Sequence, residues 1–350
     1  MVTVIETTSA FEVLQTEWER FEDNPQMRIF QTYAWCKAAW DCYLSKEHGA
    51  RLWILRWHQE GKDDVVIFPF YSDGDGCLRF IMDTHSDICD AVYPKGGNRN
   101  AVYKEVAEYI LSERRIKSIW LQKMCGESEA LRYLGVFLSA PVVYKDNAFS
   151  WVCSVKCEDY ITNQTQMRSK DKADLKAIRR KAEKYEMDII SVEKGDPFPE
   201  EKILEFRKAM LANTSREIAF LPDDLVNFSR HIYDSSCADI VTLSEQGKMV
   251  ALNFILKKDK SYLSWIFLYT NPRTSTAMYA KLLTRLAQER AFEFNFGVGV
   301  YSYKIGTFRP ETGLTFSLRC GLTWWRHLTC ALAMNYRFAK DYLKAKLRKH

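Results

Sequence analysis

The stretch FNFGVGVYSYK, from Phe294 to Lys304, contains the pattern that decides the fold. Its first residues are apolar and aromatic, which is typical of a short buried strand. Two glycines then allow a sharp change of direction, and Tyr301, Tyr303 and a lone lysine follow at once. The pattern predicts the carboxyl end of a strand in an α/β sheet, where ligand-facing groups are commonly presented.

A predicted strand and a predicted helix precede this stretch. SYLSWIFLYT, Ser261–Thr270, is almost continuously apolar and aromatic, which predicts a central strand buried on both faces. After the break NPRTST, the spacing of apolar residues predicts a helix over Thr276–Arg290. Backbone N–H groups of Ser275, Thr276 and Ala277 would then offer a phosphate site. The local sequence alone favours an ordinary helix start, because it contains no glycine-rich cradle.

The same order of predicted elements occurs twice. Leu52–Tyr71 and Asp239–Lys257 each predict a strand, a turn at Gly-Lys and a second strand. Helical segments precede each hairpin, and another strand and a helix follow it. We therefore expect two similar α/β units in tandem, each a mixed sheet flanked by helices. Their expected bounds are 1–145 and 146–322. A basic amphipathic helix at 323–350 is expected to pack on the second unit, and a helix on a membrane surface is the less favoured alternative.

The composition, with 47% hydrophobic and 27% charged residues, is that of an ordinary soluble globular protein. The net charge of +5 over 350 residues is too mild to indicate DNA binding. The ten cysteines form no CxxC pair, and neither a secretion signal nor a long apolar run is visible. These features predict a cytoplasmic protein with reduced thiols, no metal site and no transmembrane segment.

Four motifs follow one another along the chain. They are FQTYAWCKAAW with its spaced tryptophans, the basic segment MRSKDKADLKAIRRKAEKY, a glycine-containing hairpin, and an ending with Phe296, Gly297, Gly299, Tyr303 and Lys304. In this order they resemble the CelD-like (cellulose-biosynthesis type) acyltransferases of the GNAT superfamily, which are relatives of FemAB-type transferases. The resemblance covers roughly residues 10 to 320.

The resemblance implies a tandem GNAT-like fold in which two central strands of the second unit diverge and hold an acyl-CoA thioester between them. Gly297 and Gly299 would turn the chain at the mouth of that gap. Tyr303 and Lys304 would line the donor or acceptor pocket, with Lys304 on an anionic part of a substrate. The residues alone favour a core tyrosine and a solvated or ion-paired lysine.

The resemblance also implies roles on the donor side. The strand with Trp265 and Phe267 would hold the thioester oxygen through its backbone N–H groups. The pyrophosphate would lie on Ser275, Thr276 and Ala277, where the family's Pro-Gly is absent. No metal is implied.

Further side chains are candidates for catalysis and for substrate binding. Glu293 is a candidate base, although a glutamate at a strand edge is commonly solvated. Tyr269, Tyr301 and Tyr303 are candidates to protonate the leaving thiolate. Asn295 replaces the family's aspartate, which keeps the hydrogen-bonding shape but removes the charge.

The segment 168–185 contains eight Lys or Arg residues and three acidic ones. It predicts either a solvated helix face or a site for an anionic acceptor such as a sugar nucleotide or a tRNA, with Arg179 and Arg180 as contacts.

Three functions remain open at this point. The first is an acyltransferase that moves an acyl group, acetyl above all, from acyl-CoA to an amine or hydroxyl of a cell-envelope or polysaccharide precursor. The second is an aminoacyl-tRNA-dependent FemAB-like transferase, which the absence of a long coiled-coil insertion disfavours. The third is an inactive GNAT tandem that serves as a binding module, because Asn295 and Ser275–Ala277 depart from the family pattern.

Overall fold

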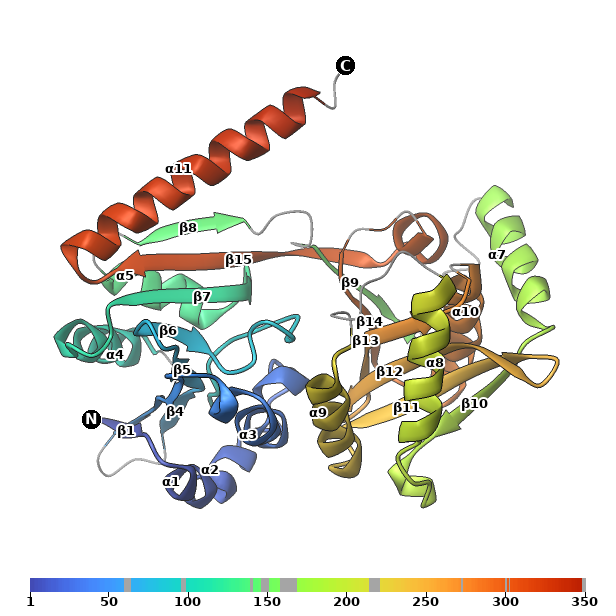
Figure 1. The fold of residues 1–350 in the computed structure, drawn as a ribbon, viewed down its shortest axis with the longest axis horizontal. Coiled ribbons are helices and arrows are strands. Elements are labelled where there is room, and N and C mark those ends of the chain that lie inside the picture. The colour runs from blue at the N-terminus through green and yellow to red at the C-terminus, as the bar shows by residue number, and fades with distance from the viewer. Residues whose placement is uncertain are drawn as a thin grey trace. The chain divides into compact units, whose positions relative to one another are not determined.

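The computed structural model describes residues 1–59, 64–95, 99–138, 141–145, 151–157, 169–213, 221–271, 273–299, 301 and 303–347. The chain divides into two compact units. Figure 1 shows the first in blue to green together with the red C-terminal segment, and the second in green to orange. The first unit contains Met1–Asp146 together with Thr315–His350, and the second contains Asn147–Leu314.

The second unit is a mixed sheet with helices on both faces. Its strands are β9 (Trp151–Lys156), β10 (Glu186–Ile190), β11 (Ala238–Glu245), β12 (Lys248–Lys258), β13 (Ser261–Tyr269), β14 (Glu293–Val298) and the first residues of β15 (Glu311–Gly321). They pair in the order β10-β11-β12-β13-β14-β9-β15. Every pair is antiparallel except β13 with β14, which is parallel.

Helices cover both faces of this sheet. They are α7 (Ser169–Ala182), α8 (Glu200–Asn213), α9 (Asp223–Asp234) and α10 (Arg273–Gln288), with short turns η5 (Val192–Lys194) and η7 (Lys304–Phe308). Residues of α7 and α10 share one apolar core with the sheet. On α9, Phe228 packs on Trp265 of β13. The apolar spacing of α10 therefore buries one helix face on a strand run that is itself apolar on both sides.

The first unit contains two groups of strands. The strands are β1 (Val2–Ile5), β2 (Arg51–Leu52), β3 (Ile54–His58), β4 (Val65–Phe68), β5 (Phe70–Ser72), β6 (Cys77–Phe80), β7 (Ser118–Cys125) and β8 (Val142–Lys145). One group pairs as β1-β3-β4, and the other as β2-β5-β6-β7 followed by the second half of β15. Pro69 alone separates β4 from β5, because proline has no N–H for the ladder.

The helices of the first unit surround these strands. They are α1 (Thr8–Val13), α2 (Gln15–Glu19), α3 (Tyr33–Cys42), α4 (Asn100–Ser112), α5 (Gly135–Phe137) and α11 (Trp324–Leu347), with η1 (Ile29–Gln31), η2 (Leu44–Lys46) and η3 (Ala130–Leu134). Its core contains side chains of β3 to β7, α4 and β15. Among the described residues, no helix is both long enough and apolar enough to cross a membrane.

The two units repeat one topology, as the sequence predicts. In the second unit, antiparallel strands β11, β12 and β13 lead through α10 to the parallel strand β14. In the first unit, the antiparallel strands end in β6, which leads through α4 to the parallel strand β7. Gln246 and Gly247 join β11 to β12 with φ angles of 52° and 75°, the conformation of a type I′ hairpin turn. The other predicted turn, at Gly61-Lys62, lies outside the described residues.

The second unit ends at Leu314, whereas the sequence predicts its end at residue 322. Residues 311–314 of β15 pair with β9 in the second unit, whereas residues 315–321 pair with β7 and β8 in the first. One long strand thus contributes to both units, and it brings α11 into the first unit rather than the second. A single uninterrupted strand carries no composition signal at such a division.

Candidate functional site

The central strands of the second unit separate after a short parallel contact. Within the described residues, β13 and β14 pair at three positions, Ser261 with Glu293, Tyr262 with Phe294 and Leu263 with Asn295. Beyond these positions β13 continues along β12, and β14 continues along β9. The divergence expected from the resemblance is therefore present in the strand register.

Asn295 shapes the end of β14. Its side chain is buried, and its Oδ1 accepts a hydrogen bond from the N–H of Gly297 at 2.8 Å. The ladder with β9 shifts register between these two residues, and Gly297 has a φ of 73°. Asparagine at this position therefore stabilises a bulge that needs glycine two residues later. The sequence predicts Asn295 to bind substrate, but in the structure its side chain bonds to the backbone of its own strand.

Gly299 makes room for an aromatic ring. Its φ is 109°, and a Cβ atom at this position would lie 2.6 Å from Cε2 of Tyr301. Only glycine combines this backbone conformation with such a close ring. The two glycines of the opening motif thus have separate tasks, one at the bulge and one beside Tyr301.

Three tyrosine rings stack from the surface into the core. Tyr301, 46% exposed, lies 5.9 Å from Tyr303 between ring centroids, at an interplanar angle of 15°. Tyr303 lies 6.1 Å from the buried Tyr279 of α10, at 7°. The Gly-x-Gly turn therefore places Tyr303 between an exposed phenol and a buried one.

A chain of hydrogen bonds continues from these rings into the sheet. The hydroxyl of Tyr279 lies 2.8 Å from Oγ of Ser264 on β13. Asn253 of β12 donates to that Oγ at 2.9 Å.

Burial raises the pKa of Tyr279 to about 12. Burial, together with the neighbouring Tyr279, also raises the pKa of Tyr303. Both phenols thus keep their protons at neutral pH.

Lys304 lies in a different environment from the one that the sequence predicts. The side chain is 3% exposed, and its Nζ donates to the carbonyl oxygen of Phe296 at 2.6 Å. The carbonyl oxygens of Gly297 and Val298 lie at 3.5 and 3.4 Å, and the Tyr301 ring centroid at 5.0 Å. An ammonium so enclosed by backbone carbonyls holds the strand end in place, so the expected cleft-facing lysine is corrected to a buried one.

Glu293 lies at the other end of the same strand. It is the first residue of β14 and pairs with Ser261 and with Lys156 of β9. Four residues of strand separate it from Gly297, a distance of about 13 Å. The structure therefore does not bring Glu293 together with Tyr303.

Trp265 and Phe267 contact helices on opposite faces of the sheet. The Trp265 ring packs on Phe228 of α9, whereas the Phe267 ring packs on Tyr279 of α10. A register shift between Phe254 and Ile255 of β12 accompanies this change of side. Of the two, Phe267 joins the tyrosine cluster, and Trp265 does not.

Helix α10 starts one turn earlier than the apolar spacing indicates. It begins at Arg273, whose N–H donates to Oδ1 of Asn271 at 3.0 Å. Ser275 and Ala277 are buried in the first turn, and Thr276 is half-buried. The helix start that the sequence predicts to bind a phosphate therefore includes Arg273 and Thr274 as well as Ser275 and Thr276, and the phosphate site stays a prediction.

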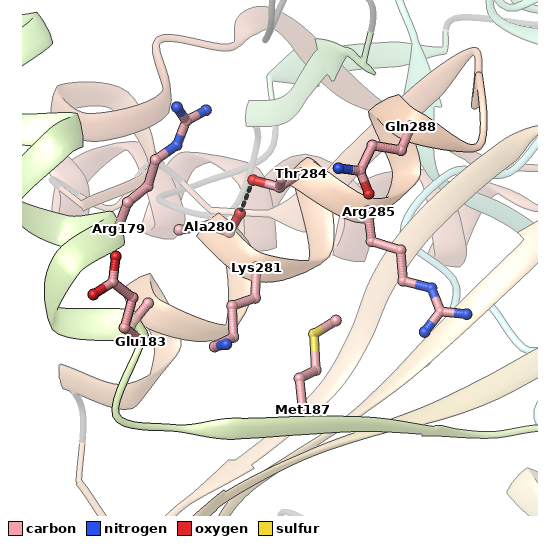
Figure 2. A pocket seen from close by; sticks show the side chains of 9 residues that line it. Arg179, Glu183, Met187, Ala280, Lys281, Thr284, Arg285 and Gln288 are labelled. Atoms are coloured by element: carbon pink, nitrogen blue, oxygen red, sulfur yellow. Dashed lines mark hydrogen bonds between the residues drawn. The ribbon is translucent and has the colours of Figure 1, made fainter.

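A pocket of about 610 Å³ lies between α7, α10 and β10. Figure 2 shows Arg179 and Glu183 on the α7 side, with Lys281 and Arg285 on α10 and Met187 on β10. Arg285 pairs with Glu289 at 2.8 Å. Arg180, one residue from Arg179, is exposed and does not line this pocket. Of the two arginines that the sequence predicts to contact an anionic acceptor, only Arg179 therefore lines this pocket.

The first unit has a smaller pocket at the corresponding helix start. It measures about 430 Å³ and is lined by Asn100, Ala101, Lys104 and Phe137, the first three at the start of α4. Helix α4 corresponds to α10 in the repeated topology. This pocket is therefore the competing position to consider for the ligand that the sequence predicts at the start of α10. No group of three potential metal-ligating side chains occurs in the part of the chain that the structure describes.

Asn253 and Ser264 lie in the hydrogen-bonded group with Tyr279 but were not predicted from the sequence. Each is a polar residue inside an otherwise apolar strand, NFILK in β12 and SYLSWIFLY in β13. A buried polar side chain needs a partner, so two such residues in paired strands are the signal that was available.

Searches of family models and of curated proteins found no match for this chain. Solved structures do match its fold. L-PGS from Bacillus licheniformis has a TM-score of 0.57 at 14% identity and covers 92% of this chain and 95% of its own. FemX has a TM-score of 0.55 at 9% identity, with 91% and 96% covered.

A third match is a tandem GNAT protein from the clavulanic acid biosynthesis pathway. Its TM-score is 0.51 at 8% identity, and the alignment covers 92% of this chain and 99% of that protein. The tandem GNAT-like α/β fold predicted from the sequence is therefore confirmed. At such identities the likeness concerns the fold alone.

Proposed function

We propose that this protein is a GNAT-type acyltransferase whose donor site lies between β13 and β14 of the second unit. The observation that carries the proposal is the divergence of these two parallel strands after three residue pairs, in the unit where the Tyr303 ring stacks on Tyr279. A flat thioester group fits between separating strands, where backbone N–H groups can hold its oxygen.

In the proposed reaction, an amine or hydroxyl of the acceptor attacks the thioester carbon. The new bond to the acceptor forms, the C–S bond breaks, and the CoA thiolate accepts a proton from Tyr303. The proton that the acceptor loses is returned to the Tyr303 oxygen, so CoA leaves as the thiol and Tyr303 is restored. Ser264 holds Tyr279 by a hydrogen bond, and the stacked Tyr279 ring holds the Tyr303 ring in position. The first turn of α10, around Thr276, binds the pyrophosphate.

The proposed donor is acyl-CoA, with acetyl-CoA as the simplest example. The CelD-like resemblance supports an acceptor among cell-envelope or polysaccharide precursors. Titration calorimetry with acetyl-CoA and with free CoA tests the donor. We expect both to bind and Tyr303→Phe to bind them equally well, because its hydroxyl acts on the leaving thiolate. Failure of either ligand to bind the wild-type protein would contradict the proposal.

A second candidate donor is aminoacyl-tRNA. Helix α7 favours it, because five of its cations are exposed: Lys170, Lys172, Lys176, Arg180 and Lys181. Such a row would bind a phosphate backbone with a strong dependence on salt. Retention of tRNA on a filter measures this binding. Lys176→Glu with Arg180→Glu would weaken it, whereas the same charge change on α8, Lys202→Glu with Lys208→Glu, serves as the control.

A further inference from the structure

The last helix of the chain presents an apolar face to solvent. Trp324 and Trp325 are 69% and 68% exposed, and Leu332 and Tyr336 are 58% and 72% exposed. Spacings of three, four and four place Trp325, Leu328, Leu332 and Tyr336 on one side of α11. This stripe is about 16 Å long, from the rise of an α-helix.

The opposite side of α11 attaches the helix to the first unit. Cys330 is buried, and it lies on the side of the helix away from Leu328 and Leu332. Arg326 donates a hydrogen bond to the carbonyl oxygen of Asp75 at 3.4 Å. The helix is therefore held at its N-terminal half, and Figure 1 shows it extending from the end of β15. Its apolar stripe remains uncovered in the first unit, among the side chains that the structure describes.

Positive charge is concentrated in the same segment. Residues 324–350 contain seven Lys or Arg and one Asp, a net charge of +6. The whole chain has a net charge of +5, so the other 323 residues sum to −1. The segment is thus strongly basic, as is the segment 168–185, and its partner is expected to be anionic.

We infer that α11 binds the surface of an anionic lipid bilayer. An exposed apolar stripe beside a cluster of lysines and arginines is the pattern of a helix that lies in the membrane interface. Trp324, Trp325 and Tyr336 combine an apolar ring with a polar edge, and such side chains prefer the boundary between lipid and water. A dimer seam would explain the apolar stripe but not the charge, and a nucleic-acid site would explain the charge but not the leucines. This inference is independent of the proposed function.

Vesicle flotation with the full chain tests the inference. The probes are vesicles of phosphatidylcholine alone and of phosphatidylcholine mixed with phosphatidylglycerol. We expect the wild-type protein to float with the anionic vesicles, to dissociate from them as salt is added, and to remain unbound with the neutral ones. Trp325→Ser with Leu332→Ser should lower the partition coefficient roughly ten-fold or more, because both side chains would enter the interface. Lys340→Ser with Lys344→Ser should lower it for anionic vesicles as well.

The control variant is Val136→Ser, which removes an exposed apolar side chain of the first unit outside α11. It should float like the wild-type protein. Circular dichroism checks that every variant is folded. The inference is overturned if the wild-type protein does not float, if Val136→Ser and the α11 variants lose binding equally, or if light scattering shows a dimer that Trp325→Ser abolishes while lipid has no effect.

Discussion

Lys304 and Phe296 are joined by a buried hydrogen bond, from Nζ to the carbonyl oxygen, at 2.6 Å. The lysine follows Phe296 by only eight residues, so the Gly-x-Gly turn folds the chain back on the end of its own strand. Lys304→Met removes the donor but keeps the aliphatic stem. We expect a loss of about 1.5–3 kcal/mol in the free energy of unfolding, measured by denaturant titration.

Lys281→Met is the matched control for this substitution. Lys281 lines the α7–α10 pocket, and its ammonium makes no hydrogen bond or ion pair with a residue that the structure describes. Its loss should leave stability within about 0.5 kcal/mol. Unchanged stability of Lys304→Met with weakened ligand binding would instead favour a substrate-contacting lysine.

Tyr279→Phe should impair turnover more than donor binding. The substitution removes the hydroxyl that bonds to Ser264, so the ring that stacks on Tyr303, the proposed proton donor, is held less firmly. We expect kcat to fall roughly ten- to hundred-fold with KM for acyl-CoA nearly unchanged. The measurement is steady-state kinetics with the acceptor once known. An equal fall in CoA affinity, measured by calorimetry, would show a role in packing instead.

Gly299→Ala should destabilise the second unit. The added methyl group would meet the Tyr301 ring at 2.6 Å, and φ is 109°. We expect a loss of about 1–3 kcal/mol in the free energy of unfolding. Gly306→Ala, where nothing lies within 4 Å of the added atom, is the control and should cost less than about 0.5 kcal/mol. Equal thermal midpoints for the two variants would contradict the ring contact.

Asp90 in the first unit should make stability fall as pH rises. Its carboxylate accepts hydrogen bonds from the N–H groups of Ala91, Glu129 and Ala130, at 2.8 to 3.2 Å. Burial nevertheless raises its pKa to about 6. The folded state therefore holds this proton more tightly than the unfolded state. Between about pH 4 and pH 6 the wild-type protein should lose about 2–3 kcal/mol relative to Asp90→Asn.

Chemical denaturation of both proteins at several pH values measures this difference. Above about pH 6 the difference should stay constant, since Asp90 is then ionised in both states. A difference that does not change between pH 4 and pH 6 would mean that Asp90 keeps an ordinary pKa in the folded protein.

Much of the fold was predictable from the sequence because it rests on local patterns. The apolar run of β13, the helix spacing of α10 and the glycine pair after β14 each identify an element, and their repetition predicts the tandem. The division of β15 between the units depends on which strands reach it, and no residue in it marks that choice. Lys304 was misplaced for a similar reason, since a lysine after a turn gives no sign that carbonyl oxygens enclose it.

The candidate site was predictable in part. The motif led to Tyr303, but its partners Tyr279, Ser264 and Asn253 come from three other elements. Their polar atoms meet only when the sheet and α10 pack together. Likewise, Trp265 and Phe267 point to opposite faces because the ladder between β12 and β13 shifts register. The residue types in these strands do not predict that shift.

Binding of CoA to two matched variants tests the central claim most directly. Thr276→Glu places a negative charge in the first turn of α10, and Ala101→Glu places one in the first turn of α4, beside the competing pocket. Both charges suit a helix N-terminus, so folding should be preserved. The account predicts that calorimetry detects CoA binding to the wild-type protein and to Ala101→Glu, with affinity for Thr276→Glu at least roughly ten-fold weaker. Full binding to Thr276→Glu, with loss in Ala101→Glu, would contradict a donor site in the second unit.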